Sequence, residues 1–461
     1  MRCARFVPVA AVLLLAAPVM AQSDDCELLP TPGSQATLYN QGTQNQMMFI
    51  GGGARFRCPD GVQIQSDSVA YFEASGIVEF VGRARYADVD NRLTGDYLRY
   101  LTRERQAIAQ GNVVLTEIAS GSVITGPYLI YNQKSDTRPE QLIQFQTGRP
   151  HAVLVRAARA DSIPQDTTIV DADAMEIEGA SSFRARGRVE IVQGRTRGWG
   201  LEADYDKQLG SMRLAGDARM VSEDYELQSD TIHAETDEND EPGRLTGRGR
   251  ARLVSADATV DAPRIDILFE DGEVARLVAV AIRDTAPAQT AGDSLSQHAR
   301  AVSTDFRLTA DSIDARVPGR AIETVTAVGT AYGERLTADL ANANVPAIAA
   351  NDWMRGDTIV AAFVEDTLAA PDSTGRRPRA LERVTALGGV DLATSSYRVI
   401  DDQDPDVVSV NYVRAERIVV SLAGGSVSVV NAQGSVHGVY LQPVSRTKPG
   451  GGSTIAASRT R

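Results

Sequence analysis

The fold of this chain is decided by residues 62–101, which read VQIQSDSVAYFEASGIVEFVGRARYADVDNRLTGDYLRYL. Apolar and polar side chains alternate here with the period of two that is typical of a β-strand with one buried face. A glycine, Gly82, interrupts the central strand without disturbing the alternation. One face holds Val78, Phe80, Ala84 and Tyr86, and the other holds Glu79, Arg83 and Arg85.

Two phrases related to this stretch alternate along the rest of the chain. The first phrase runs through a Ser-Asp, Gly-Asp or Ala-Asp pair, and the second has a glycine inside a strand. Aspartate phrases read IQSDSVAYF (64–72), LTGDYLRYL (93–101), VDADAMEIE (170–178), LEADYDK (201–207), LQSDTIHAE (227–235), LTADSIDAR (308–316) and MRGDTIVAAF (354–363). Glycine phrases read VEFVGRARY (78–86), AIAQGNVVL (107–115), FRARGRVEI (183–191), MRLAGDARM (212–220), LTGRGRARL (245–253), VTAVGTAYG (325–333), VTALGGVDL (384–392) and VNAQGSVHG (430–438).

The repeat predicts an all-β fold of stacked strand pairs. Two strands and two turns account for an interval of roughly 30 residues, and no helical period is sustained outside the first residues. A single pair cannot bury its apolar face, but stacked pairs enclose a continuous apolar interior. A glycine that recurs at the same place in each strand indicates a bend or bulge that curves the sheet inward.

The N-terminus has the features of an export signal, predicted for residues 1–21. Arg2 and Arg5 precede an apolar run, and Val19-Met20-Ala21 fits a cleavage site. The run is shorter than the ~20 residues that a membrane span needs. Cys26 and Cys58 are the cysteines that follow this signal. In an oxidising compartment they could pair, and two free thiols are the alternative.

Residues 62–101 resemble the OstA-like (LptA-like) family of periplasmic lipopolysaccharide-transport proteins. The similarity lies in the strand with Ser-Asp, the following strand with Phe-x-Gly and the third strand with its own Asp, and QGNVVL at 110–115 matches a Gly-Asn-Val pattern of the family. Looser copies extend over most of residues 62–441. The resemblance implies an extended antiparallel β-jellyroll, folded into a V, whose open groove carries lipid acyl chains. The groove residues that it implies are Val62, Ile64, Val78, Phe80, Ala84, Tyr86, Val113 and Leu115.

The same resemblance implies a periplasmic protein that forms part of a trans-periplasmic bridge. Association with the outer membrane is a second expectation that follows from it. The expected partners are lipopolysaccharide, through its lipid A acyl chains, and other Lpt-type jellyrolls that pair edge strands with it. Head-to-tail homo-oligomers follow from the same pairing of edges.

Several divisions of the chain are compatible with the repeat. We expect a signal at 1–21, followed by an N-terminal lead-in at 22–61. Three repeat regions are expected at 62–155 (the best match to the family), 169–283 and 301–442. A disordered tail is expected at 443–461. Polar stretches at 156–168, 284–300 and 366–380 are either linkers between tandem jellyrolls or long hairpin loops on one sheet. One continuous groove and two or three tandem jellyrolls therefore both remain open.

The apolar interior and the arginines each allow a second interpretation. Without the family resemblance, a packed core is the better default for alternating strands. Aromatics make up 5% of the chain, and a lining of Ala, Gly and Val would leave room for a ligand. Of 47 basic residues only Lys134, Lys207 and Lys448 are lysines, so the arginine bias reflects either phosphate binding or base composition. The arginines closest together in the best-matching segment are Arg83, Arg85, Arg99, Arg103 and Arg105.

Composition argues against catalysis and cofactors. The formal charge of −13 argues against sequence-independent binding of nucleic acid. The four histidines are far apart in the sequence, and none has a second His or Cys at the spacing of metal ligands. One acid per strand is unlike a glycosidase pair or a calcium loop and predicts a turn or strand-edge device. The acids in question are Asp67, Asp96, Asp173, Asp204, Asp230, Asp311 and Asp357.

Two other functional classes remain as alternatives to lipid transport. A structural or adhesive β-solenoid on the cell surface shares the repeat but requires parallel strands. A secreted carbohydrate enzyme on a β-helix needs paired carboxylates beside aromatic platforms, and no acid pair flanks Trp199 or Trp353. We therefore expect a binding protein rather than an enzyme.

Overall fold

A computed structural model describes most of the chain outside its two ends. The described residues are 26–155, 167–179, 182–206, 209–236, 242–281, 298–336, 351–366, 370–371, 377–400, 408–423 and 426–442. The expected signal (1–21) and disordered tail (443–461) lie outside these ranges. Within them, none of the helical structure is long and apolar enough to cross a membrane.

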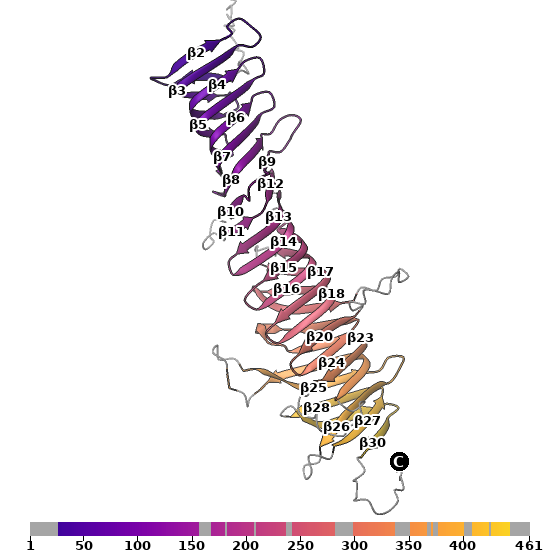
Figure 1. The fold of residues 1–461 in the computed structure, drawn as a ribbon. Helices are drawn as coiled ribbons and strands as arrows, with labels where there is room; N and C mark the ends of the chain where they lie inside the picture. The colour runs from indigo at the N-terminus through magenta and orange to yellow at the C-terminus, as the bar shows by residue number, and fades with distance from the viewer. Residues whose placement is uncertain are drawn as a thin grey trace, which may run out of the picture. The chain divides into compact units, whose positions relative to one another are not determined.

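The chain divides into two compact units, Met1–Pro139 and Glu140–Arg461, and each is treated by itself. The N-terminal unit is a run of antiparallel strands in which each strand from β3 onward pairs with the next. Its first two strands both pair with β3, each along one half of it. The strands are β1 (Glu27–Pro30), β2 (Gln35–Tyr39), β3 (Met47–Arg57), β4 (Gln63–Phe72), β5 (Ile77–Ala87), β6 (Asn91–Leu101), β7 (Gln106–Glu117) and β8 (Val123–Asn132) (Figure 1).

The C-terminal unit continues the same antiparallel pattern. Its first strands are β9 (Leu142–Phe145), β10 (His151–Val155), β11 (Thr167–Asp171), β12 (Ala174–Glu178), β13 (Ser182–Gln193), β14 (Thr196–Asp206), β15 (Ser211–Val221), β16 (Tyr225–Thr236), β17 (Pro242–Ser255), β18 (Ala258–Glu270) and β19 (Glu273–Val280). Then come β20 (Ala299–Ser303), β21 (Phe306–Ala310), β22 (Ser312–Arg316), a 3-10 turn η1 (Pro318–Arg320), β23 (Thr324–Arg335), β24 (Trp353–Glu365), β25 (Arg379–Leu387), β26 (Ala393–Ile400), β27 (Val408–Ala415), β28 (Arg417–Ala423), β29 (Ser426–Gln433) and β30 (His437–Leu441).

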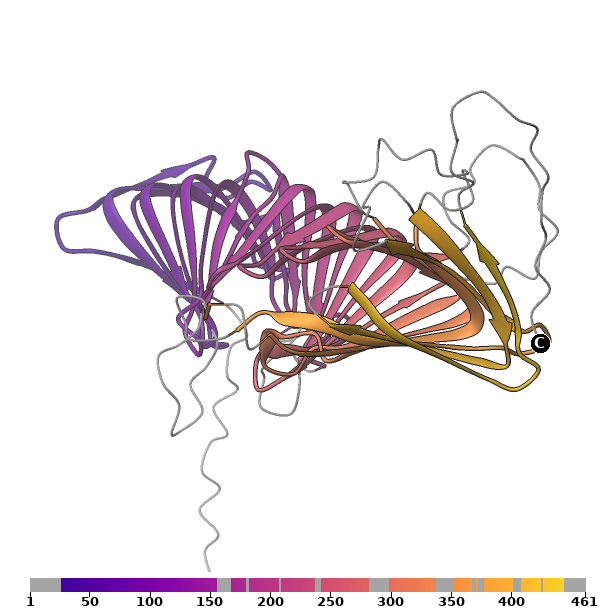
Figure 2. The ribbon, with the colours of Figure 1, turned by 90° about the horizontal axis from the view of Figure 1, so that it is seen from below.

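The expected all-β fold of repeated antiparallel strand pairs is confirmed. Each strand pair in the described part of the chain for which a residue register is defined is antiparallel, for example β5 with β6, β13 with β14 and β23 with β24. A parallel solenoid is therefore the wrong architecture for this chain, because its coils would place parallel neighbours side by side. The bend of the strands within each unit is visible in the second view (Figure 2).

Strands of the C-terminal unit are bent or broken in two at one place along their length. The first half of β13 pairs with β12 and its second half with β11, so β11 and β12 act as one strand interrupted at Ala172–Asp173. From β24 onward the two halves become separate ladders. The first half of β24 pairs with β26 and its second half with β25, and these lead to β26–β27–β30 and to β25–β28–β29.

The strands on the two sides of each polar stretch pair with each other or with one shared neighbour. β10 pairs with β11 across the first stretch, and β24 pairs with β25 across the third. β18 pairs with both β19 and β20, which flank the second stretch. The chain therefore continues its sheet across all three places.

Candidate functional site

In seven of the long strands, β3, β5, β7, β13, β15, β17 and β23, the bend is built from two successive residues with positive φ. In β5 these are Gly82 (φ 79°) and Arg83 (φ 48°), and the register with β6 shifts between Val81 and Ala84. The pair is a β-bulge of the glycine type, because two residues of β5 stand against one of its neighbour. Burial alternates correctly on both sides of the bulge, so both halves of the strand turn their apolar face inward.

An acidic residue that precedes the strand in sequence lies over most of these glycines. A Cβ added to Gly82 would meet Asp67 Oδ2 at 2.6 Å, and the Arg83 guanidinium donates to that carboxylate from Nη2 to Oδ1 at 2.7 Å. This hydrogen bond holds the pKa of Asp67 below its ordinary value of 3.8. The same arrangement recurs where Asp96, Asp173 and Asp230 face Gly111–Asn112, Gly187–Arg188 and Gly249–Arg250.

Six of the seven aspartates singled out in the sequence lie beside a glycine of a bend. Asp311 lies over Gly329 and Asp357 beside Gly389. The prediction is wrong for Asp204, which pairs instead with Arg213 at 3.2 Å on the outward face. On β14 the residue that lies over the bulge glycine of β15, Gly216, is Leu201. The residue after Gly216 is Asp217, where most other bulges have Arg or Asn. An acid at position 201 would therefore face the carboxylate of Asp217, which explains why an apolar residue replaces the aspartate here.

The eight predicted groove residues all lie on the inward face of the N-terminal unit. They are exposed by at most 2% and belong to β4, β5 and β7, apart from Val62, which directly precedes β4. The structure thus brings them together on one face, and their role in ligand binding stays a prediction. The set is Val62, Ile64, Val78, Phe80, Ala84, Tyr86, Val113 and Leu115.

Five aromatic rings fill the same interior, and three of them were not predicted from the sequence. Neighbouring rings lie 5.7–6.3 Å apart between centroids, mostly edge to face, which favours packing beyond simple burial. The rings are those of Phe56, Phe80, Tyr86, Tyr100 and Tyr131. Here the interior is a packed aromatic core, not the thin lining that the low aromatic content had indicated.

The hydroxyls of these tyrosines are held at the edge of the core. Tyr86 and Tyr131 both donate to Asp88 Oδ2, at 2.8 and 2.6 Å, and Tyr100 donates to Gln133 Oε1 at 3.1 Å. Burial, together with the negative charge of Asp88, raises the pKa of Tyr86 and Tyr131 far above the ordinary value of 10. The pKa of Tyr100 is raised chiefly by burial. The three rings are therefore neutral donors at physiological pH.

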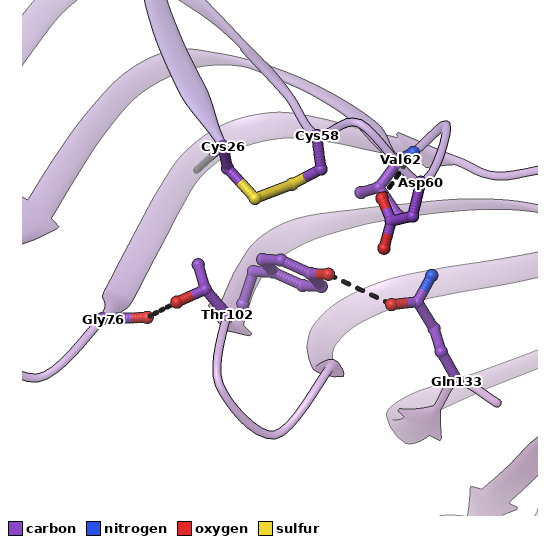
Figure 3. Close-up of a disulfide and its surroundings, with 8 residues drawn as sticks. Cys26, Cys58, Asp60, Val62, Gly76, Thr102 and Gln133 are labelled. Atoms are coloured by element: carbon purple, nitrogen blue, oxygen red, sulfur yellow. Dashed lines mark hydrogen bonds between the residues drawn. A yellow bond between two sulfur atoms is a disulfide. The ribbon is translucent and has the colours of Figure 1, made fainter. Parts of the chain in front are cut away.

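A disulfide joins Cys26 to Cys58 beside this core (Figure 3). Cys26 directly precedes β1 and Cys58 directly follows β3, and these two strands pair antiparallel with Glu27 opposite Arg57. Cys58 is buried, with 5% of its surface exposed. The bond ties the first described residue of the unit to its first long strand.

The interior of the C-terminal unit is lined by smaller side chains. Phe145 and Phe183 are buried near its start, but most inward positions of β13–β19 hold Ala, Val, Leu or Ile. The buried alanines of this stretch, each at most 3% exposed, are Ala185, Ala203, Ala218, Ala251, Ala262 and Ala279. This lining matches the composition that the sequence predicted for a groove.

Charges are paired on the outward face. Arg99 donates to Glu79 Oε1 at 2.8 Å, and Arg103 donates to the carbonyl of Ala74 at 2.9 Å. A hollow of about 340 Å³ on the outward face of β13–β16 is lined by polar side chains, among them Arg184, Asp204 and His233. Burial and the charges of Arg248 and Arg213 lower the pKa of His233. Across the described ranges, no cluster of three or more His, Cys, Asp or Glu is arranged to hold a metal ion.

No protein-family model matches this chain, and neither does any curated protein. Among solved structures, the chain is similar to LptH, the LptA-homologous periplasmic component of the conserved lipopolysaccharide transport device from Pseudomonas aeruginosa. Sequence identity is 14%, the TM-score is 0.23, and the match covers 33% of this chain and 88% of LptH. A likeness of this strength supports neither a fold nor a function.

Proposed function

We propose that this chain is an exported, non-enzymatic lipid-binding protein that shields acyl chains between the two halves of its bent strands. The lipid we propose is lipopolysaccharide, and the place is the periplasm. The observation that carries the proposal is the continuous inward apolar face, repeated from β3 to β8 and again from β13 to β24. Charged side chains occupy the outward face, so the interior offers the apolar surroundings that an acyl chain requires.

Acyl chains would enter by separating the two halves of the bent strands, because the inward side chains contact one another. Each methylene that leaves water gains ~0.8 kcal/mol, so a chain of about twelve carbons gains roughly 10 kcal/mol. Fully burying a Val, Leu or Ile side chain stabilises by ~1.5–3 kcal/mol. A bound acyl chain can therefore offset the separation of several facing side chains.

The two units would differ in how readily they accept a chain. Packed aromatic rings must move apart in the N-terminal unit, whereas mostly Ala, Val, Leu and Ile line the C-terminal interior and leave less to displace. We propose that the C-terminal unit, at Leu214 and Ala218, takes acyl chains at least as readily as the predicted residues Phe80 and Val113.

Partners of like fold would attach at the ends of the ladders. In the described part of the chain, β29 pairs with β28 and β30 with β27, and each has its other backbone edge unpaired. An exposed edge can take up a strand from another protein. We propose edge pairing with other jellyroll proteins of a trans-periplasmic bridge, or with a second copy.

A photocrosslinking amino acid tests the proposal at matched inward and outward positions. Replacing Phe80, Val113 or Leu214 should give crosslinks to lipopolysaccharide in cells, and replacing their outward neighbours Glu79, Arg83 or Arg213 should give none. Equal labelling of both sets would contradict an acyl-binding interior. Mass spectrometry of lipid extracted from the purified protein identifies the amphiphile, and the absence of any acyl lipid would also contradict the proposal.

A further inference from the structure

The beginning of the described chain includes a long stretch without charged side chains. Residues 28–54 contain no Asp, Glu, Lys, Arg or His, although 23% of the whole chain is charged. This stretch forms β1, β2 and the first part of β3, at the N-terminal end of its unit (Figure 1). Four large apolar side chains in it are exposed: Leu29 (36%), Leu38 (39%), Tyr39 (49%) and Phe49 (41%).

Cross-strand pairing arranges part of these side chains, with their neighbours, into an apolar band. Tyr39 lies opposite Met47, Met47 opposite Phe72, Phe72 opposite Ile77 and Ile77 opposite Leu101. Phe49 lies two residues from Met47 and so on the same face. These positions alternate with the buried Ile50, Val69 and Val78, so the band faces outward. The apolar band consists of Tyr39, Met47, Phe49, Phe72, Ile77 and Leu101.

The hairpin between β2 and β3 satisfies many of its own polar groups. Thr43 donates from Oγ1 to the Asn40 carbonyl at 2.7 Å, and Gly42 N–H donates to Gln46 Oε1 at 3.0 Å. Gln46 in turn donates to Glu73 Oε2 at 2.8 Å, which fixes the hairpin to the next turn. Polar groups that already have partners lose less on leaving bulk water.

The turns beside the apolar band are balanced in charge. Glu73 follows β4, and Arg103, Glu104 and Arg105 follow β6, which gives two acids and two bases. The chain as a whole carries a formal charge of −13 and would be repelled by an anionic membrane surface. This end of the N-terminal unit can therefore approach such a surface with little repulsion.

We propose that the apolar band and the β2–β3 hairpin form a docking surface for a phospholipid bilayer. Tyr39 and Phe49 enter the interface between headgroups and acyl chains, where aromatic side chains are favoured. The uncharged hairpin lies against the headgroups. Contact is shallow and reversible, driven by apolar burial rather than by attraction between charges. This surface is separate from the acyl-binding interior and does not depend on it.

Flotation with vesicles of phosphatidylethanolamine and phosphatidylglycerol at a ratio of 3:1 tests the proposal on the full mature chain. We expect the wild type to float with the vesicles, at low and high salt alike. A Tyr39→Ser/Phe49→Ser double variant should lose at least tenfold in partition coefficient. The matched control, Val89→Ser/Leu209→Ser, removes two isolated side chains that are 76% and 74% exposed, and should change it less than twofold.

The depth to which residue 39 enters the bilayer is measured with a tryptophan placed at that position. Emission of Tyr39→Trp should shift to the blue on vesicle addition and be quenched by brominated lipid, and Val89→Trp should show neither change. Equal flotation of the band and control variants would overturn the proposal, as would binding that disappears at high salt. Loss of self-association in the band variant, without any vesicle binding by the wild type, would overturn it in favour of a protein partner.

Discussion

Arg83 on the bulge of β5 binds Asp67 on β4 through two nitrogens, with Nη2 at 2.7 Å from Oδ1 and Nε at 3.0 Å from Oδ2. The carboxylate that receives them lies over Gly82, where a side chain would have no room. Three residues thus fix one bend: a glycine that adopts positive φ, the residue after it, and an acid on the neighbouring strand. The stability of the bend should depend on all three.

Gly82→Ala should destabilise β4 and β5. Positive φ costs a residue with a Cβ ~1–2 kcal/mol, and the clash with Asp67 adds to it, so we expect about 2–4 kcal/mol in total. Amide hydrogen exchange in these strands reports the local free energy of opening. Gly121→Ala is the control, because Gly121 also has positive φ (76°) but nothing lies within 4 Å of an added Cβ. A similar loss in both variants would show that Asp67 does not constrain the bend.

Asp67→Asn should lower the stability of the bend at neutral pH and remove the part of its pH dependence that comes from this pair. The pKa of Asp67 is lowered by its hydrogen bond to Arg83, so the pair stabilises the folded state above the ordinary pKa of 3.8 and loses this effect as pH falls through the folded value. The melting temperatures of wild type and variant should therefore differ at pH 6 and converge in acid. The pair is exposed, so the difference should be small. A constant difference at every pH would contradict this explanation.

Alkaline pH should unfold the N-terminal unit cooperatively. The pKa values of Tyr86, Tyr100 and Tyr131 are raised in the folded state, so each keeps a proton that the unfolded chain releases near pH 10. Stability is then lost as pH rises above 10, at about 1.4 kcal/mol per pH unit for each tyrosine. Phenolate absorbance from these rings should appear only with unfolding, and each Tyr→Phe variant should lower the slope by about 1.4 kcal/mol per pH unit. Their ionisation near pH 10 in the folded protein would refute the burial argument.

Reduction of the disulfide should destabilise the N-terminal unit. The bond closes a loop with a sequence separation of 32 residues, for which the chain-entropy estimate is about 3–4 kcal/mol. Chemical denaturation with and without dithiothreitol measures the effect. A Cys26→Ser/Cys58→Ser variant should resemble the reduced wild type and show no response to the reagent.

The repeat made the bends predictable from sequence, because glycine inside a strand and one acid per strand both have a local cause. Asp67 and Gly82 could be recognised from their phrases alone. Leu201 was missed because the phrase around Asp204 looks like the others, and the actual register is visible only from Gly216 on the partner strand. The acid after that glycine, Asp217, was the signal that could have identified the exception.

The aromatic core could not be predicted as a cluster. Phe56, Tyr100 and Tyr131 come from β3, β6 and β8, and each obeys the inward alternation of its own strand. Only the pairing of strands brings each of these rings within 6.3 Å of a neighbouring ring. The aromatic content averaged over the whole chain is low and does not reveal that the five rings gather in the N-terminal unit.

The separation of the ladders after β24 makes the mechanical compliance of the C-terminal unit uneven along its length. Where a strand runs unbroken through the bend, as in β13 to β17, spreading the two halves strains a continuous backbone and the ladder bonds on both sides of it. Beyond β24, short connections such as Glu416 between β27 and β28 join the two halves in the described part of the chain. Rotation about a few backbone dihedrals there breaks the backbone hydrogen bonds that Glu416 makes with Gly388 and Gly434 but leaves both ladders intact, so the same outward force produces its largest displacement at the last strands.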